Sequence, residues 1–283
     1  MSRKFLLPEN IYLYYGGISR TLDLSALRDR LAGWLPNARI EVREAFLRYW
    51  PARTSDAEGG GLIDDLAERL ARAKVRDPNG RPRSFRPLYG EIEYERRRLR
   101  DPNVKGFGIL YDGFRLQMVC SNLLGDEESG ADHLHVVFTD QLFGTWDPDD
   151  LRYHVRVNVC GYPSLISTSG IVEGPAKPRE YYLLKQQYEA MGMGGSRLME
   201  LKEQFAGTFI DYDDPRLTDA MKGYAAQCLF FHAIGEPFCD DPECRLYNAH
   251  WQEELIRAQL GEVDFCVRHR EMLTRRRGDA VTR

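Results

Sequence analysis

The sequence predicts an α/β protein, and three observations support this fold class. The chain of 283 residues opens with strand, helix, strand and helix patterns in turn, which is the order typical of parallel α/β folds. Further strand patterns follow between residues 133 and 169. After them, the segment from Asp214 to Gly235 has a continuous apolar stripe at helical spacing. We therefore expect a sheet with this last helix buried against it.

The N-terminal elements follow from local composition. Residues 10–15 are aromatic and branched and are closed by two glycines, which indicates a buried strand. Residues 24–34 carry an apolar stripe before a proline and predict a helix. Residues 38–46 predict a second strand, and residues 62–75 predict a second amphipathic helix.

The middle of the chain predicts mainly strands. Residues 107–111 and 114–120 flank an Asp-Gly pair, which is a strong signal for a β-hairpin. Residues 133–138 and 165–169 each predict a strand, and residues 153–159 alternate as an edge or half-buried strand should.

A predicted helix at residues 180–191 is followed by three glycines within four residues, which mark the best candidate for a flexible linker. The sequence shows no internal repeat and no low-complexity tract. We expect one domain over residues 1–283, in four parts: 1–76, 77–130 with the hairpin, 131–234 with the central sheet and long helix, and 235–283.

Charge and composition limit the possible partners. The net charge is −4, and the arginines between residues 76 and 100 alternate with Glu91, Glu93 and Glu95. This pattern predicts a solvated, charge-paired face and argues against nucleic-acid binding. No apolar run is long enough for a signal peptide or membrane span, so we expect a cytoplasmic protein without a membrane partner. Six cysteines in such a chain are better explained as thiols or metal ligands than as disulfides.

The long helix carries two candidate metal ligands. Asp214 is a good N-cap, and Gly235 suits a left-handed C-terminal stop. Cys228 and His232 are four residues apart and share the apolar face, which is the spacing of ligands in a helix-borne metal site. The alternative is that Cys228 is a small buried hydrophobe and His232 a hydrogen-bonded core histidine.

A second ligand set follows the helix. Cys239, Cys244, Cys266 and His269 have the spacing C-x4-C-x21-C-x2-H. Three thiolates and one imidazole suit a tetrahedral zinc ion that is closed by four protein ligands, as in structural sites. The alternative is a chance pair of cysteines with two unrelated core residues. Asn248 and Gly261 predict the ends of a helix between the two ligand pairs.

The spacing from Cys228 to Leu246 resembles that of the archaemetzincins, a branch of the metzincin zinc peptidases. Their motif reads H-E-x-x-H-x-x-G-x-x-H-C-x4-C-x-M, with a C-x-x-C pair further on. As a whole, the chain is similar to a microbial family that carries a metallopeptidase label. On this resemblance the first His position is taken by Cys228, the Glu position by Leu229, the second His position by His232 and the third by Phe238. The Cys3His set takes the position of the family's second zinc site.

The resemblance implies a metzincin-like fold, with a twisted mixed sheet, an active-site-type helix and a small C-terminal part held by zinc. It also implies that residues 164–169 form the edge strand that lines a substrate cleft. The catalytic motif is degenerate, because only His232 is retained among the zinc ligands. Leu229 cannot act as a base and Phe238 has no lone pair. A third metal donor would have to come from Glu236, Asp240 or His250.

Three other histidines are weaker candidates. His133 and His135 share one face of a predicted strand and could form half of a metal site with His154 or Asp140. Nothing in the sequence fixes that geometry, so a structural role is favoured.

Two functions remain open. The first is a zinc metallopeptidase-like protein of archaemetzincin type that keeps one structural zinc. Its degenerate motif argues against a second, catalytic zinc and against peptide hydrolysis. Whether the chain is an enzyme is left open. The second is a non-catalytic, zinc-stabilised scaffold that binds a peptide or protein partner in the inherited cleft. The number of zinc ions per chain would discriminate between them, since the scaffold needs only one.

Overall fold

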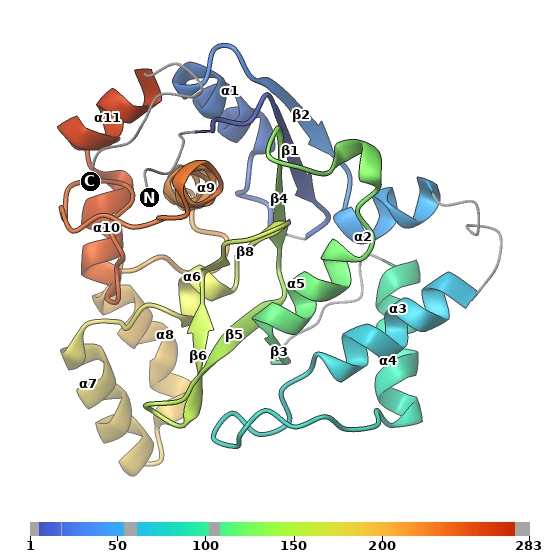
Figure 1. The fold of residues 1–283 in the computed structure, drawn as a ribbon. Helices are drawn as coiled ribbons and strands as arrows, with labels where there is room; N and C mark the ends of the chain where they lie inside the picture. Colours follow the sequence, from blue (N-terminus) through green and yellow to red (C-terminus); the bar gives the residue numbers. More distant parts are fainter. Residues whose placement is uncertain (1–5, 18, 54–60, 102–107, 275–283) are drawn as a thin grey trace.

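The computed structural model describes residues 6–17, 19–53, 61–101 and 108–274. Its centre is a five-stranded mixed sheet with helices on both faces (Figure 1). Four strands are parallel and the fifth is antiparallel at one edge. In spatial order they are β2 (Arg39–Arg43), β1 (Asn10–Tyr15), β4 (His133–Thr139), β8 (Ser164–Ser167) and β7 (Asn158–Val159). A smaller sheet contains β3 (Leu110–Asp112), β5 (Leu142–Asp147) and β6 (Arg152–Arg156).

Alternation of side chains divides the core into two layers. Ile11 and Leu13 of β1 face one side of the sheet, and Tyr12 and Tyr14 face the other. Because both faces are apolar, each needs a cover of helices. The first is covered by α1 (Leu24–Trp34) and α9 (Leu217–Ile234), with α10 (Gln252–Leu260) and α11 (Val267–Thr274) further out. The second is covered by α2 (Phe46–Tyr49), α3 (Gly61–Arg72), α4 (Tyr89–Arg100) and α5 (Gly113–Ser121).

The remaining helices lie below the sheet in Figure 1. They are α6 (Gly170–Glu173), α7 (Arg179–Ala190) and α8 (Gly194–Gln204), and two short 3-10 turns occupy Pro51–Arg53 and Asp126–Glu128. Within the described part of the chain, every helix is too short or too polar to cross a membrane. The predicted α/β fold class with a mixed sheet is confirmed.

Helix α9 is the buried helix that the apolar stripe predicts. Its residues Met221, Tyr224 and Cys228 belong to the core beneath the sheet. The helix begins at Leu217, three residues later than Asp214, whose side chain accepts a hydrogen bond from the Arg216 amide. It ends at Gly235, which has the left-handed conformation that we expect there, with φ of 74°.

The predicted hairpin around Asp112 is wrong. Residues 110–112 form strand β3, but residues 113–121 form helix α5. The Asp112 carboxylate accepts hydrogen bonds from the backbone amides of Phe114 and Arg115, both at 3.1 Å, and so caps the helix. The same Asp-Gly pair that favours a hairpin turn therefore starts a helix here.

Several boundaries also differ from the predictions. Residues 153–159 form two strands in different sheets, and β5 has no counterpart in the predictions. The strand predicted at 38–46 ends at Arg43. Strand β8 is flanked by β4 and β7 and is not an edge strand.

The glycines after α7 do not form a linker. Gly192 has φ of 71° and turns the chain, and Gly194 already begins α8, which packs against α7. Asn248 does not cap α10, because that helix begins at Gln252 and Glu254 accepts from the amides of His250 and Trp251.

Replacing Gly235 with Ala should destabilise the protein by about 1–2 kcal/mol, because a Cβ is disfavoured at φ of 74°. Urea unfolding measures this. Gly33→Ala is the matched control, since Gly33 lies in α1 and an added Cβ there meets no atom within 4 Å. The control should be neutral or stabilising by about 0.5–1 kcal/mol. Equal stability of wild type and Gly235→Ala would contradict the prediction.

Candidate metal centre

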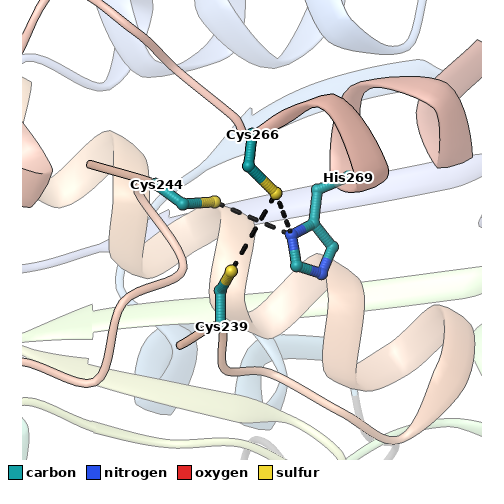
Figure 2. Close-up of side chains that lie close together, drawn as sticks. All are labelled: Cys239, Cys244, Cys266 and His269. Atoms are coloured by element: carbon teal, nitrogen blue, oxygen red, sulfur yellow. Dashed lines mark hydrogen bonds between the residues drawn. The ribbon is translucent and has the colours of Figure 1, made fainter. Parts of the chain in front are cut away.

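The four predicted zinc ligands come together at one end of α9. Cys239 and Cys244 lie in the loop after that helix, and Cys266 and His269 lie at the start of α11. The loop is held in place by a hydrogen bond of 2.9 Å from the Cys239 amide to the Leu246 carbonyl. The four side chains point toward one another (Figure 2), and their ligand atoms all lie within 4.8 Å of one another.

The spacing of these atoms fits tetrahedral zinc. The Sγ atoms of Cys239 and Cys266 are 3.9 Å apart. The Nδ1 atom of His269 lies 3.7 Å from Cys244 Sγ and 3.2 Å from Cys266 Sγ. Zinc–sulfur bonds of about 2.3 Å and zinc–nitrogen bonds of about 2.0 Å give tetrahedral edges of roughly 3.5–3.8 Å. One ion could therefore contact all four atoms with small adjustments.

A metal ion that binds this cluster has to displace thiol protons. Burial raises the pKa of the Cys244 thiol to about 12, and burial likewise raises the pKa of Cys239. The backbone supplies some compensation, because the Asp241 amide donates to Cys239 Sγ at 3.4 Å. The amides of Cys266 and Leu246 donate to the Cys244 sulfur. A bound metal ion deprotonates coordinating thiols outright, so this donor set matches what zinc requires.

The cluster is backed by an apolar layer between α9 and α11. Phe230 of α9 contacts the His269 ring edge-on, with ring centroids 5.1 Å apart. Phe265, Met272 and Leu246 complete the same layer. A metal ion held here would fasten the C-terminal segment to the outer side of α9.

The motif positions on α9 and just after it have a different environment. Cys228 and Leu229 are both 0% exposed and belong to the core under the sheet. The Cys160 thiol lies close to that of Cys228, and their interaction raises the pKa of Cys160. His232 forms a hydrogen bond of 2.8 Å between its Nε2 and the Ala131 carbonyl, and Phe238 is 46% exposed. Cys228, Leu229 and His232 are thus engaged in packing and backbone contacts, whereas Phe238 lies at the surface.

The structure does not bring a third donor to Cys228 and His232. Among the described residues, the Cys3His set is the one group of three or more possible ligands close enough to share an ion. Glu236 lies instead beside Arg268, with 3.8 Å between the carboxylate and guanidinium. Neither Asp240 nor His250 joins the motif histidine in such a group.

His133 and His154 likewise have ordinary partners. His133 Nδ1 lies 3.1 Å from the Tyr12 hydroxyl, and His154 Nε2 lies 2.8 Å from a carboxylate oxygen of Asp150. Neither is part of a possible metal group in the described chain. The structural role that the sequence favours agrees with these contacts.

His135 is wholly buried between two hydrogen-bond partners. Its Nδ1 lies 2.9 Å from the Tyr14 hydroxyl, and its Nε2 lies 2.9 Å from the Glu128 carbonyl. A neutral ring with its proton on Nε2 satisfies both contacts. Burial lowers the pKa of His135 to about 4.

A cavity that the sequence does not reveal lies at the carboxyl ends of β1, β4 and β8. We call it the strand-end cavity, and its volume is about 1180 Å³. The loops after β1 and β4 approach closely there. A Cβ on Gly17 would lie only 2.3 Å from an Asp140 oxygen, so glycine is needed at this position. Polar residues that follow the strands line its mouth: Ser19, Thr139, Asp140, Thr168 and Ser169.

The strand-end cavity lies where the sheet changes direction. The chain leaves β1 through α1 to β2 on one side, and it later returns to β4 on the other side of β1. In open α/β sheets, ligands bind outside the carboxyl ends of strands at such a switch point. The signal in the sequence is only a polar or glycine residue after each strand, which many unrelated loops share.

The fold and the cluster together define an α/β protein with a Cys3His group of the kind that binds zinc. The chain belongs to the probable metallopeptidase family (DUF6775), whose model matches residues 7–276. This confirms the family that the sequence resembles. The crystal structure of archaemetzincin from Methanopyrus kandleri is similar with a TM-score of 0.45 and 11% identity, over 94% of this chain and 93% of that one. A search of curated proteins finds no match.

The buried His135 predicts a loss of stability in acid. Its pKa is about 4 in the folded protein and about 6.5 when unfolded, so the unfolded chain binds the proton more readily. The stabilisation is complete above pH 6.5, is lost as the pH falls toward 4, and amounts to about 3 kcal/mol. His135→Gln keeps polar atoms without titrating, so its stability should fall less over this range. Urea unfolding at pH 7, 6, 5 and 4 tests this, and parallel pH curves would contradict it.

Proposed function

We propose that this protein is a zinc-stabilised, metallopeptidase-like protein of archaemetzincin type that lacks ordinary zinc-peptidase catalysis. The observation that carries the proposal is the contrast between its two ligand sets. Cys239, Cys244, Cys266 and His269 converge, whereas Cys228 and His232 have no third ligand among the described residues. A metzincin needs three imidazoles, an open zinc position and a carboxylate base.

The converging set supports one structural ion per chain. Four protein ligands leave no open position for water, so such an ion would contribute folding free energy and no hydrolysis. The position of the general base is held by the buried Leu229, which also argues against hydrolysis. A general base typically contributes ~10²- to 10⁴-fold to the rate of the reaction. Reduced thiols suit the cytoplasm, which we propose as the compartment.

The second candidate is a scaffold that binds a peptide or another ligand without cleaving it. The strand-end cavity favours it, because this cavity is large and lies at the N-terminal end of α9, where Leu217 lines it. The degenerate motif is at the opposite end of the same helix. Ligand binding at the strand ends therefore needs no catalytic zinc.

Protein purified without added metal should contain one zinc per chain. Cys244→Ser should lose most of it and make the segment after residue 239 more sensitive to proteases, because one of four ligands is gone. Elemental analysis and limited proteolysis measure these effects. Cys160→Ser is the matched control, since Cys160 lies outside the Cys3His group and should leave zinc content unchanged. Full zinc content in the Cys239→Ser, Cys244→Ser double variant would disprove the assignment.

Zinc-loaded and chelator-treated protein should both fail to cleave a library of unstructured peptides above background. The reason is the absence of a base at Leu229 and of a ligand at Phe238. Mass spectrometry of the library after prolonged incubation is the measurement. Zinc-dependent cleavage that disappears in folded His232→Ala would show that a working site has been rebuilt from other residues.

A further inference from the structure

The inner end of the strand-end cavity contains a buried charged group. Glu95 of α4 is 0% exposed, although the alternation of arginine and glutamate in this segment predicts a solvated face. Its carboxylate lies 2.7 Å from Lys74 Nζ and 3.2 Å from Arg98 Nη1. The Tyr111 hydroxyl donates to the same carboxylate at 2.7 Å. The prediction of a solvated face is therefore wrong at Glu95, which is held in the interior.

Arg98 is fixed in position by this group. Its Nη1 donates to the Tyr111 hydroxyl at 2.7 Å, in addition to its contact with Glu95. With the Gln141 amide oriented so that its oxygen faces the guanidinium, that oxygen accepts from Arg98 Nη2 at 2.7 Å. The Arg98 side chain is only 14% exposed and lines the cavity. The guanidinium is therefore preorganised, and its Nε donor has no acceptor among the described residues.

The group has an excess of positive charge. Lys74 and Arg98 share the single carboxylate of Glu95. Glu91 also lies near Lys74, but it pairs with Arg76 at 2.7 Å. Among the described residues, Lys74 and Arg98 therefore have one carboxylate in direct contact between them. An uncompensated charge in a buried site is costly, and an anionic ligand would offset that cost.

The walls beside Arg98 are apolar. Leu70 of α3, Leu116 and Cys120 of α5 and Leu165 of β8 all line the cavity there. Burial raises the pKa of the Cys120 thiol to about 12, so this side chain is neutral. The inner end thus combines one cation with an apolar surface.

The mouth of the cavity limits the total charge of a ligand. Asp140, Glu173, Asp211 and Asp213 line the cavity together with Arg20 and Arg48, and Asp211 also pairs with Lys202 at 2.6 Å. The remaining excess of carboxylates would repel a second negative charge. A polyphosphate or nucleotide would meet these carboxylates. A ligand with a single carboxylate and a hydrocarbon group meets less repulsion from these carboxylates than a polyanion does.

From these observations we propose that the strand-end cavity binds a monocarboxylate attached to an apolar group, with Arg98 as the residue that binds the carboxylate. Arginine presents paired N–H donors that match a carboxylate, and a cavity of this size can enclose a short peptide end or a small acid. Two sources share this chemistry: a peptide C-terminus with an apolar last residue, and a free aliphatic acid. The proposal deepens the binding role above and rests on it.

The test measures binding to the full-length protein by calorimetry and ligand-observed NMR. One pair of probes is an N-acetylated tripeptide ending in leucine, with either a free carboxylate or an amide. The other pair is hexanoate and 1-hexanol. In the wild type, the free acid of at least one pair should bind at least about tenfold more tightly than its neutral analogue, because a hydrogen-bonded charge pair is lost in the latter. The pair that binds identifies the source.

Arg98→Gln should weaken binding of the acid at least about tenfold and leave the neutral analogue unchanged. Arg97→Gln is the matched control, because Arg97 is adjacent on α4, is exposed and does not line the cavity. The proposal is overturned if neither acid binds, if acid and neutral analogue bind equally in the wild type, or if methyl phosphate binds more tightly than either acid. The comparison in wild-type protein does not depend on the folding of a variant. Failure here leaves the zinc and hydrolysis measurements unaffected, so the two proposals fail separately.

Discussion

The packing of α9 against one face of the parallel sheet is the contact on which the rest of the molecule depends. Met221, Tyr224 and Cys228 fill the layer beneath β1, β4 and β8, and helix α1 lies beside them in the same core. Burial of one such side chain stabilises the fold by about 1.5–3 kcal/mol, so this helix contributes much of the hydrophobic free energy. Its two ends then fix two sites: the Cys3His cluster follows its C-terminus, and the strand-end cavity reaches its first residue, Leu217.

This arrangement makes Cys228 and Leu229 part of the hydrophobic core. Both are 0% exposed, and neither buries a strongly polar atom that would need a partner. The Cys3His cluster has a separate role, since it joins the loop after α9 to α11 in a region with a small apolar layer of its own.

Local signals in the sequence predict some elements well and others poorly. The Cys3His set is predictable because its residue types are rare and fall into two closely spaced pairs, and α9 is predictable because its apolar stripe is continuous. Asp112-Gly113 fails because one dipeptide suits both a hairpin turn and a helix start, and only the packing of Leu116 decides between them. The cavity is not predictable, because residues as distant as Gly16 and Asp213 line it and no periodicity links them. Arg98 resembles its exposed neighbours in sequence, and only the tertiary fold buries Glu95 against it.

The two edges of the main sheet have a consequence for the behaviour of the protein at high concentration. Exposed edge strands offer unpaired backbone groups to other chains and promote aggregation. Here β7 at one edge has only two residues, and β2 at the other edge carries the charged residues Arg39, Glu41 and Arg43 along its length. A short edge and a charged edge both discourage strand-to-strand association between molecules. The sheet can therefore remain open, without closing into a barrel, and still leave little surface from which a fibril could grow.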